Sequence, residues 1–235
     1  MRLTFDNLGE AAELERGTWP ADEPLGHHRS VTTVLPRLLD ELDVHGLQAA
    51  FFVEGINCEL YPDALVGIAA RGHELGVHGW RHEPWAQLPA DRERELLMRA
   101  DGAFRALGLA PGGFRPPGGA ATGQTAALLG ELGYTYWSRA APVSPAPGLN
   151  DLTFDWDLVD AYWLMERFAD QRRGRGDPGD PLVPSAVGER LARAARGDVL
   201  VLHPFLMLDE AWWEQVRRLL ELASRCSPTR SHDEQ

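Results

Sequence analysis

The chain has 235 residues, of which 44% are apolar, enough to bury a substantial core. Its formal net charge of −12 argues against nucleic acid and against an anionic membrane as partners, because like charges would repel over most of the surface. All 23 basic residues are Arg, which excludes a mechanism through a Schiff-base lysine.

Short apolar runs alternate along the chain with longer amphipathic segments. The short runs predict strands at residues 3–5, 48–53, 73–79, 112–116, 134–138, 152–156 and 199–203. The segments with a helical period cover residues 30–45, 62–71, 90–107, 122–132, 185–196 and 209–225. This order predicts one α/β domain, residues 1–225, with a mostly parallel sheet covered by helices. The number of units suits a barrel better than an open sheet.

Three stretches lack a clear apolar period. Residues 8–23 do not begin a convincing helix, and residues 169–184 combine charge, Gly and Pro, which predicts a mobile loop. We expect residues 226–235 to form a disordered tail.

The cysteines and the N-terminal sequence bear on the compartment. Cys58 and Cys226 are too few and too far apart for a disulfide framework or a thiolate metal site, so we expect reduced thiols. The chain begins without a basic region followed by an apolar stretch, and no run reaches the roughly 18 apolar residues of a membrane span. These features predict a cytoplasmic protein and leave a homo-oligomer open.

Five polar residues fall at or just past the C-terminal ends of predicted strands: Asp6, His78, Arg115, Asp155 and His203. Barrels of the α/β class assemble their active sites at that end of the strands. We therefore expect these residues to converge in space.

The segment HELGVHGWRHEPW, residues 73–85, places His78 and His82 four positions apart. Residues 79–84 predict a turn or one helical turn, on which side chains four apart share a face. Two imidazoles on one face beside an acidic residue commonly hold a divalent cation, typically zinc. The alternative is a pair of solvent-facing turn residues, because this spacing is frequent by chance.

Three other motifs carry weaker signals. TFDN, residues 4–7, places Asp6 after the first strand, where it could also cap a helix. FRPPGG, residues 114–119, sets Arg115 in a rigid turn, and a surface Arg is the alternative. VLHPF, residues 201–205, ends an apolar strand with His203, which could be a core histidine.

Taken in chain order, these motifs resemble those of the polysaccharide deacetylase family, carbohydrate esterase family four. TFDN is similar to the family's T-F-D-D, GWRHEP to its H-[ST]-x-x-H, FRPPGG to its R-x-P-[YFG]-G and LVLHP to its L-x-x-H. The resemblance extends from Leu3 to about Ala223 and implies a distorted barrel of seven or eight strands.

The resemblance implies a metal-dependent hydrolase that removes an acyl group, acetyl above all, from an amide nitrogen. His78 and His82 with an oxygen from Asn7 would hold a divalent metal ion, most simply Zn²⁺. Asp6 would accept the proton of the attacking water, and His203 would protonate the departing amine.

By the same resemblance, Arg115 would orient Asp6 through a charge-assisted pair. Position 7 departs from the pattern, because the family has a ligating Asp where this chain has Asn7. An amide oxygen can coordinate but brings no charge. Alternatively, Asp6 itself ligates the metal, which leaves the base unassigned.

The family's usual D-x-x-D-W motif is also absent, since residues 137–142 contain no acid. The run LTFDWDLVDAYW, residues 152–163, instead resembles the tryptophan and paired-acid segment of the allantoinase-like and cyclic-imidase branch. Asp155 or Asp160 would then support the site, and we favour Asp160. Aromatic residues of this run could wall a pocket or pack in the core: Trp156, Tyr162 and Trp163.

The leading hypothesis is therefore hydrolysis of an acylated sugar or other small molecule. One alternative is a cyclic amide or ureide hydrolase on the same scaffold. Another is a catalytically inactive carbohydrate-binding relative, which Asn7 favours and the joint presence of Asp6, Arg115 and His203 opposes.

Overall fold

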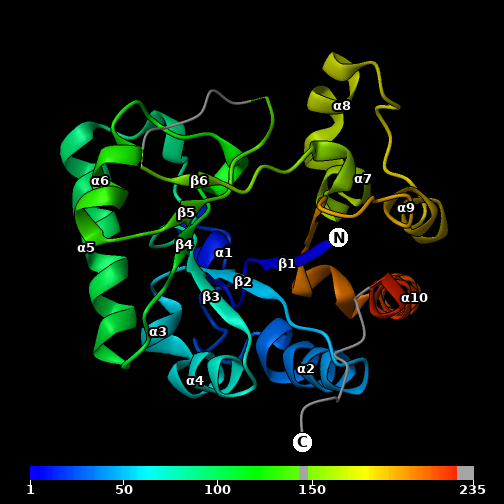
Figure 1. The fold of residues 1–235 in the computed structure, drawn as a ribbon, viewed down its shortest axis with the longest axis horizontal. Coiled ribbons are helices and arrows are strands. Elements are labelled where there is room, and N and C mark those ends of the chain that lie inside the picture. The colour runs from blue at the N-terminus through cyan, green and yellow to red at the C-terminus, as the bar shows by residue number, and fades with distance from the viewer. Residues whose placement is uncertain (143–147, 227–235) are drawn as a thin grey trace, which may run out of the picture.

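The computed structural model describes residues 1–142 and 148–226 (Figure 1). Seven strands form one sheet in the order β6-β5-β4-β3-β2-β1-β7, and every neighbouring pair is parallel. The strands are β1 (Arg2–Asp6), β2 (Ala50–Val53), β3 (Glu74–Val77), β4 (Gly113–Phe114), β5 (Tyr136–Trp137), β6 (Asn150–Asp151) and β7 (Val199–Leu202). The predicted α/β class with a parallel sheet is confirmed.

The sheet forms a half-barrel whose edge strands are β6 and β7. Two single bridges continue the pairing beyond the regular strands, one between Ala140 and Phe154 and one between Val159 and Val201. The second bridge brings the chain after β6 against β7, so this segment spans the open side. The predicted distorted barrel is confirmed in this incomplete form.

Helices surround the sheet (Figure 1). They are α1 (Ala11–Arg16), α2 (Leu35–Val44), α3 (Asn57–Leu60), α4 (Pro62–Ala70), α5 (Ala90–Ala106), α6 (Thr125–Leu132), α7 (Asp160–Leu164), α8 (Ala169–Arg175), α9 (Pro184–Leu191) and α10 (Glu210–Cys226). Shorter helical turns are η1 (Ser30–Val34), η2 (Trp85–Gln87), η3 (Pro117–Gly119), η4 (Trp156–Leu158), η5 (Glu166–Phe168) and η6 (Pro204–Leu208). The apolar period of α2 shows why such segments cover the sheet: it buries Leu35, Leu38, Leu39 and Leu42 on one face.

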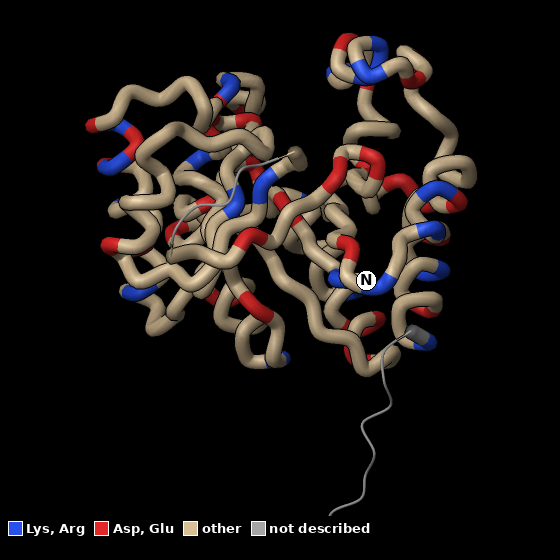
Figure 2. Tube along the Cα trace, turned by 45° about the horizontal axis from the view of Figure 1, so that its top comes forward, with Lys and Arg blue, Asp and Glu red and all other residues tan. Residues whose placement is uncertain are grey.

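The outer surface carries mixed charge. Figure 2 shows acidic and basic positions interspersed along the outer helices. Ion pairs join some of these helices, such as the 2.8 Å contact between Arg37 on α2 and Glu210 on α10. Such exposed pairs contribute little to stability, so the fold depends mainly on its apolar core.

The sixth predicted strand, residues 152–156, is wrong in position. The regular strand is Asn150–Asp151, and within the predicted range only Phe154 forms a bridge. The chain still follows β5, because the Leu152 amide donates to the Trp137 carbonyl at 2.8 Å. The alternating apolar residues therefore belong to a segment that runs beside the sheet without forming a regular strand.

The N-terminal segment also differs from the prediction, because residues 8–23 contain the helix α1. This helix is only six residues long and ends at Gly17, whose φ of 66° is readily adopted by glycine. So short a helix shows no apolar period over a sequence window, so its residues carry no helical signal.

The prediction of a mobile loop at residues 169–184 is wrong for residues 169–175, which form α8. Arg172 is fully buried and acts as the internal support of this region. Its guanidinium donates to the backbone carbonyls of Tyr162, Met165, Pro178 and Gly179. The charge of Arg172, which suggested a solvated loop, instead satisfies backbone carbonyl oxygens.

Some predictions lie at the limits of the described residues. The expected tail reaches past Cys226 into residues 227–235, which lie outside them, and the domain boundary at residue 225 stays a prediction. Cys58 is a free, buried thiol whose pKa is raised by burial to about 12, as expected of a reduced structural cysteine. None of the helices in residues 1–142 and 148–226 is long and apolar enough to cross a membrane.

Candidate active site

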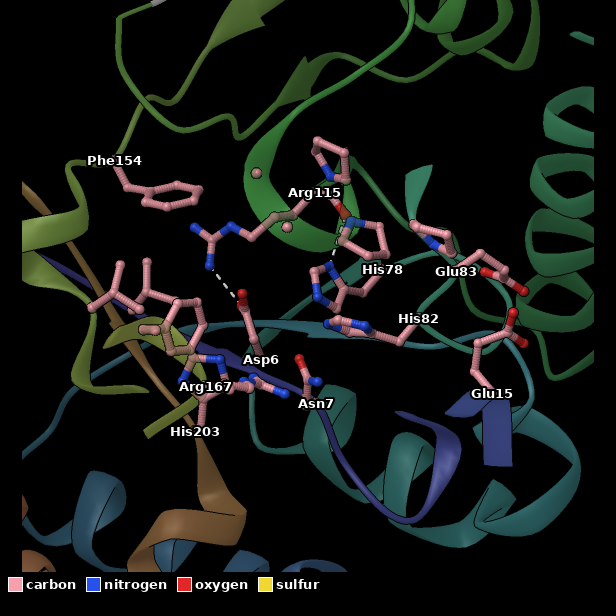
Figure 3. A pocket seen from close by; sticks show the side chains of 18 of the residues that line it. Asp6, Asn7, Glu15, His78, His82, Glu83, Arg115, Phe154, Arg167 and His203 are labelled. Atoms are coloured by element: carbon pink, nitrogen blue, oxygen red, sulfur yellow. Dashed lines mark hydrogen bonds and ion pairs between the residues drawn. The ribbon is translucent and has the colours of Figure 1, made fainter. Parts of the chain in front are cut away.

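Four of the predicted side chains meet at the carboxyl edge of the half-barrel (Figure 3). Asp6 ends β1, while His78, Arg115 and His203 directly follow β3, β4 and β7. All four line one cavity of about 560 Å³. Parallel strands bring their C-terminal ends to the same edge, which explains why residues so distant in sequence converge.

Asp155, predicted at the same edge, lies elsewhere. It is exposed, forms a 3.0 Å ion pair with Arg175 and accepts the Asp157 backbone N–H at the start of η4. The displaced sixth strand accounts for this difference. The acid that reaches the site from this run is Asp160.

Arg115 and Asp6 form a buried ion pair of 2.6 Å. Arg115 also donates to the hydroxyl of Thr4 at 2.9 Å and twice to that of Ser138, at 3.1 and 2.8 Å. Its guanidinium stacks on the ring of Phe52, 4.2 Å from the centroid. Burial lowers the pKa of Arg115, and the Asp6 carboxylate opposes this shift. The guanidinium remains a cation and fixes the orientation of the Asp6 carboxylate.

His78 and His82 approach each other, with ring centroids 5.0 Å apart. Burial lowers the pKa of His78 to about 3 and that of His82 well below its usual value, so both imidazoles are neutral near pH 7. The His78 Nδ1–H donates to the Arg115 carbonyl at 2.7 Å. The lone pair of His78 is therefore on Nε2, where it can bind a cation.

The turn between these histidines is irregular and not helical. Gly79 and His82 have φ values of 75° and 73°, and the second is unusual for a residue other than glycine. The buried Glu83 side chain closes the turn by accepting the N–H groups of Trp80 and Arg81, each at 2.9 Å. Such local strain at a cavity is typical of functional sites.

Asn7 supplies an unpaired polar atom beside these rings. Its side chain is buried, and its Oδ1 has no hydrogen-bond partner among the described residues. Its backbone is left-handed, with φ of 61°, and Figure 3 shows the amide oxygen on the side facing His78 and His82. A buried acceptor without a donor is costly, and a cation would satisfy it.

These three donors fit a divalent metal ion. Within residues 1–142 and 148–226, no group of three or more His, Cys, Asp or Glu side chains could hold a metal. The third donor at this place is the amide oxygen of Asn7, and Asn is not one of those four residue types. Asn7, His78 and His82 together still offer the nitrogen and oxygen donors that zinc accepts.

His203 is held by Asp160, the first residue of α7. The His203 Nδ1–H donates to Asp160 Oδ1 at 2.5 Å, and the His203 backbone N–H donates to Asp160 Oδ2 at 2.9 Å. Asp160 is completely buried, whereas His203 lines the cavity. The carboxylate therefore fixes the orientation of the ring through Nδ1 and leaves Nε2 free to exchange a proton with a substrate.

Aromatic rings form the wall opposite the metal-binding residues. Phe154, Trp156 and Phe168 line the cavity and contact one another through Trp156, with centroids 5.7 Å apart in both pairs. The other two aromatic residues of the run pack in the core. There the Tyr162 hydroxyl donates to Asp177, and the Trp163 indole donates to a backbone carbonyl.

The sequence interpretation missed several residues of the cavity and its support: Thr4, Arg16, Glu83, Ser138, Arg167 and Phe168. Ser138 ends a predicted strand, so the rule that found Asp6 could have found it. Arg16 and Arg167 lie in short helical segments without a sequence signal.

The sequence of the chain matches a model of the polysaccharide deacetylase family over residues 3–137. The chain belongs to the polysaccharide deacetylase family. The match ends at Trp137, so it includes Asp6, Asn7, His78, His82 and Arg115.

Known proteins agree with membership of the polysaccharide deacetylase family. A peptidoglycan-N-acetylglucosamine deacetylase from Bacillus cereus is 35% identical over 85 residues, which are 36% of this chain and 31% of that protein. The chain thus spans about a third of the length of this curated relative.

Solved structures show the same fold. A crystal structure from Mycobacterium smegmatis, whose name assigns it to the polysaccharide deacetylases, is 27% identical, with a TM-score of 0.78. The similarity covers 99% of this chain and 84% of that one. The Puue allantoinase has a TM-score of 0.65 at 17% identity, covering 95% of this chain and 83% of that chain. At that identity the likeness concerns the fold alone.

Proposed function

We propose that the protein is a metal-dependent hydrolase that removes an acyl group, acetyl above all, from an amide nitrogen of a sugar or small molecule. The main support is the meeting, in one cavity, of the Asp6–Arg115 pair and the Asp160-supported His203 beside three metal-type donors. Membership of a family whose relatives include named deacetylases adds to it.

Asn7, His78 and His82 would hold the metal, with zinc favoured by the nitrogen-rich donor set. When bound, the metal polarises the amide carbonyl and lowers the pKa of a coordinated water. Asn7 is the better oxygen ligand, because its Oδ1 lacks a partner whereas Asp6 already pairs with Arg115. Asp6 then remains available as a base.

The proton transfers fall to Asp6 and His203. Asp6 accepts a proton from the attacking water as the oxygen bonds to the carbonyl carbon, and Arg115 holds the carboxylate in place. His203 delivers a proton to the nitrogen as the carbon–nitrogen bond breaks, which releases a carboxylate and an amine. Asp160 is a positioning residue, because it keeps the His203 ring oriented and stabilises its cationic form.

A cyclic amide or ureide is the second candidate substrate. The aromatic wall of Phe154, Trp156 and Phe168 would stack against a flat ring as readily as against a sugar. Hydrolysis of a ring would use the same residues but would release no separate amine. A product analysis therefore distinguishes the two reactions.

The decisive experiment combines metal analysis with a screen of the zinc-loaded protein against N-acetylated sugars, acyl amino compounds and cyclic imides. We expect a bound divalent metal and release of free amine from an acylated compound. The double variant His78→Ala/His82→Ala should lose both, while His27→Ala, at an exposed histidine away from the cavity, should retain both.

Undiminished metal content in the double variant would contradict the assigned ligands. A zinc-loaded protein that binds sugars and hydrolyses none of these compounds would instead support the inactive carbohydrate-binding relative.

A further inference from the structure

Two arginines at the cavity have no role in the proposed reaction. Arg16 ends α1 and Arg167 lies in η5, and both line the cavity that contains Asp6 and His203. Within the described ranges, neither forms an ion pair with a carboxylate, although Arg167 lies over the ring of Phe168, 4.9 Å from its centroid. Arg115, in the same cavity, is neutralised by Asp6.

The two charges act on each other. Burial and then the charge of Arg16 lower the pKa of Arg167 to about 10. Figure 3 draws Arg167 between the positions of His203 and Asn7. Two distant segments of the chain thus bring like charges to the same cavity.

Three acidic residues line the cavity: Asp6, which is paired with Arg115, Glu15 and Glu83. Glu83 is already bonded to two backbone N–H groups of its own turn. Glu15 is directed toward Glu83 in Figure 3, and its charge helps to raise the pKa of Glu83. In Figure 3, Glu15 and Glu83 lie at one end of the cavity, and Arg167 lies at the other, basic end. An anion would be attracted to the basic end.

We propose that Arg16 and Arg167 bind an anionic group, a carboxylate or a phosphate, on the amide substrate. The guanidinium fork matches both groups and forms bidentate, charge-assisted hydrogen bonds to them. Because the chain carries a net charge of −12, most of its surface repels anions, and this local pair of cations would select acidic amides over neutral ones.

This inference rests on the proposed function for the amide, but it concerns a part of the substrate that does not react. Three compounds test it: neutral N-acetylglucosamine, N-acetylglucosamine 6-phosphate and N-acetylmuramic acid, which adds a carboxylate. Their dissociation constants are measured by calorimetry on the full chain carrying His203→Ala, so that binding is recorded without turnover. Amine release by the unmodified protein is measured separately.

We expect at least one anionic compound to bind about tenfold more tightly than N-acetylglucosamine, as one or two charge-assisted contacts would give. Arg16→Gln or Arg167→Gln should each remove most of this preference, and Arg167→Lys should retain part of it. Arg218→Gln, at an exposed arginine on α10, is the matched control and should retain all of it. Added salt should weaken the preference by screening.

Equal affinity for the three compounds, or a preference that survives in Arg16→Gln/Arg167→Gln, would overturn the proposal. The preference of one anion over the other identifies the group as carboxylate or phosphate. A charge preference without any amine release would leave the anion site standing and contradict the proposed hydrolysis of acylated sugars. Amine release without a charge preference would support the hydrolase and overturn the anion site.

Discussion

The two sides of the cavity are built in different ways. On the sheet side, Asp6, His78, Arg115 and His203 follow strand ends, are buried and have defined hydrogen-bond partners. On the opposite side, short helical segments supply less buried residues: Arg16, Trp156, Arg167 and Phe168. Reacting groups need fixed geometry, whereas recognition can use elements that adapt. We therefore place the proposed reaction on the sheet side and the proposed selectivity on the helical side.

The strongest test of the sheet side is removal of the proton-transfer groups. Asp6→Asn and His203→Ala should each lower turnover roughly 10²-fold or more, because each removes one general acid or base. Steady-state kinetics on the substrate found in the screen measures this, with circular dichroism as the folding control. A His203→Ala protein with near-normal turnover would show that His203 is a core residue held by Asp160 for stability alone.

The test of the helical side is a substitution that destabilises its local structure. Arg172→Met removes the guanidinium that donates to four backbone carbonyl oxygens, and we expect a loss of roughly 2 kcal/mol in the free energy of unfolding. Cleavage by protease near α8 should increase, and KM should rise more than kcat falls. Arg173→Met is the control, because the exposed side chain of Arg173 forms a surface ion pair with Asp170. Equal stability and equal protease cleavage of the two variants would contradict the structural role assigned to Arg172.

The metal site allows a finer comparison at one position. Asn7→Asp adds a negative charge beside His78 and His82, so zinc affinity should increase by about tenfold. A competition titration against a chelator measures this change. Unchanged affinity would indicate that Asp6, not residue 7, is the oxygen ligand. Circular dichroism should show the same fold for both proteins.

The smallest expected effect compares the two histidines flanking β3. His78 is bonded at the site, whereas both ring nitrogens of His73, at the other end, lack a partner in the part of the chain that the structure describes. Burial lowers the pKa of His73; the nearby Asp43 opposes this shift and Arg71 adds to it.

The unfolded chain therefore binds a proton at His73 at a higher pH than the folded protein does, so stability falls as the pH decreases below about 6.5. His73→Leu should reduce this decrease. Urea unfolding of both proteins at several pH values measures it, and parallel curves would show that His73 does not contribute.

The sequence predicted the sheet side far better than the helical side. Apolar strands that end in an acid, a histidine or an arginine give a local signal, and a parallel sheet brings those ends together whatever the chain between them does. No such rule covers Arg167, which lies in a three-residue turn, or Arg172, whose charge suggested solvent although it is buried. The left-handed backbone at Asn7 and His82 depends on contacts made elsewhere in the fold, which local sequence does not encode.

The bridge between Val159 and Val201 has a consequence for how the protein tolerates changes in chain length. Phe154 and Trp156 precede the bridge, and Asp160 follows it immediately. Because pairing to β7 anchors Val159, added residues between Trp156 and Val159 could reshape the aromatic wall while Asp160 keeps its place against His203. An insertion after Val159 would separate Asp160 from that ring. Lineages that diversify their substrates through this segment are therefore expected to vary in length before the bridge and to keep the spacing after it.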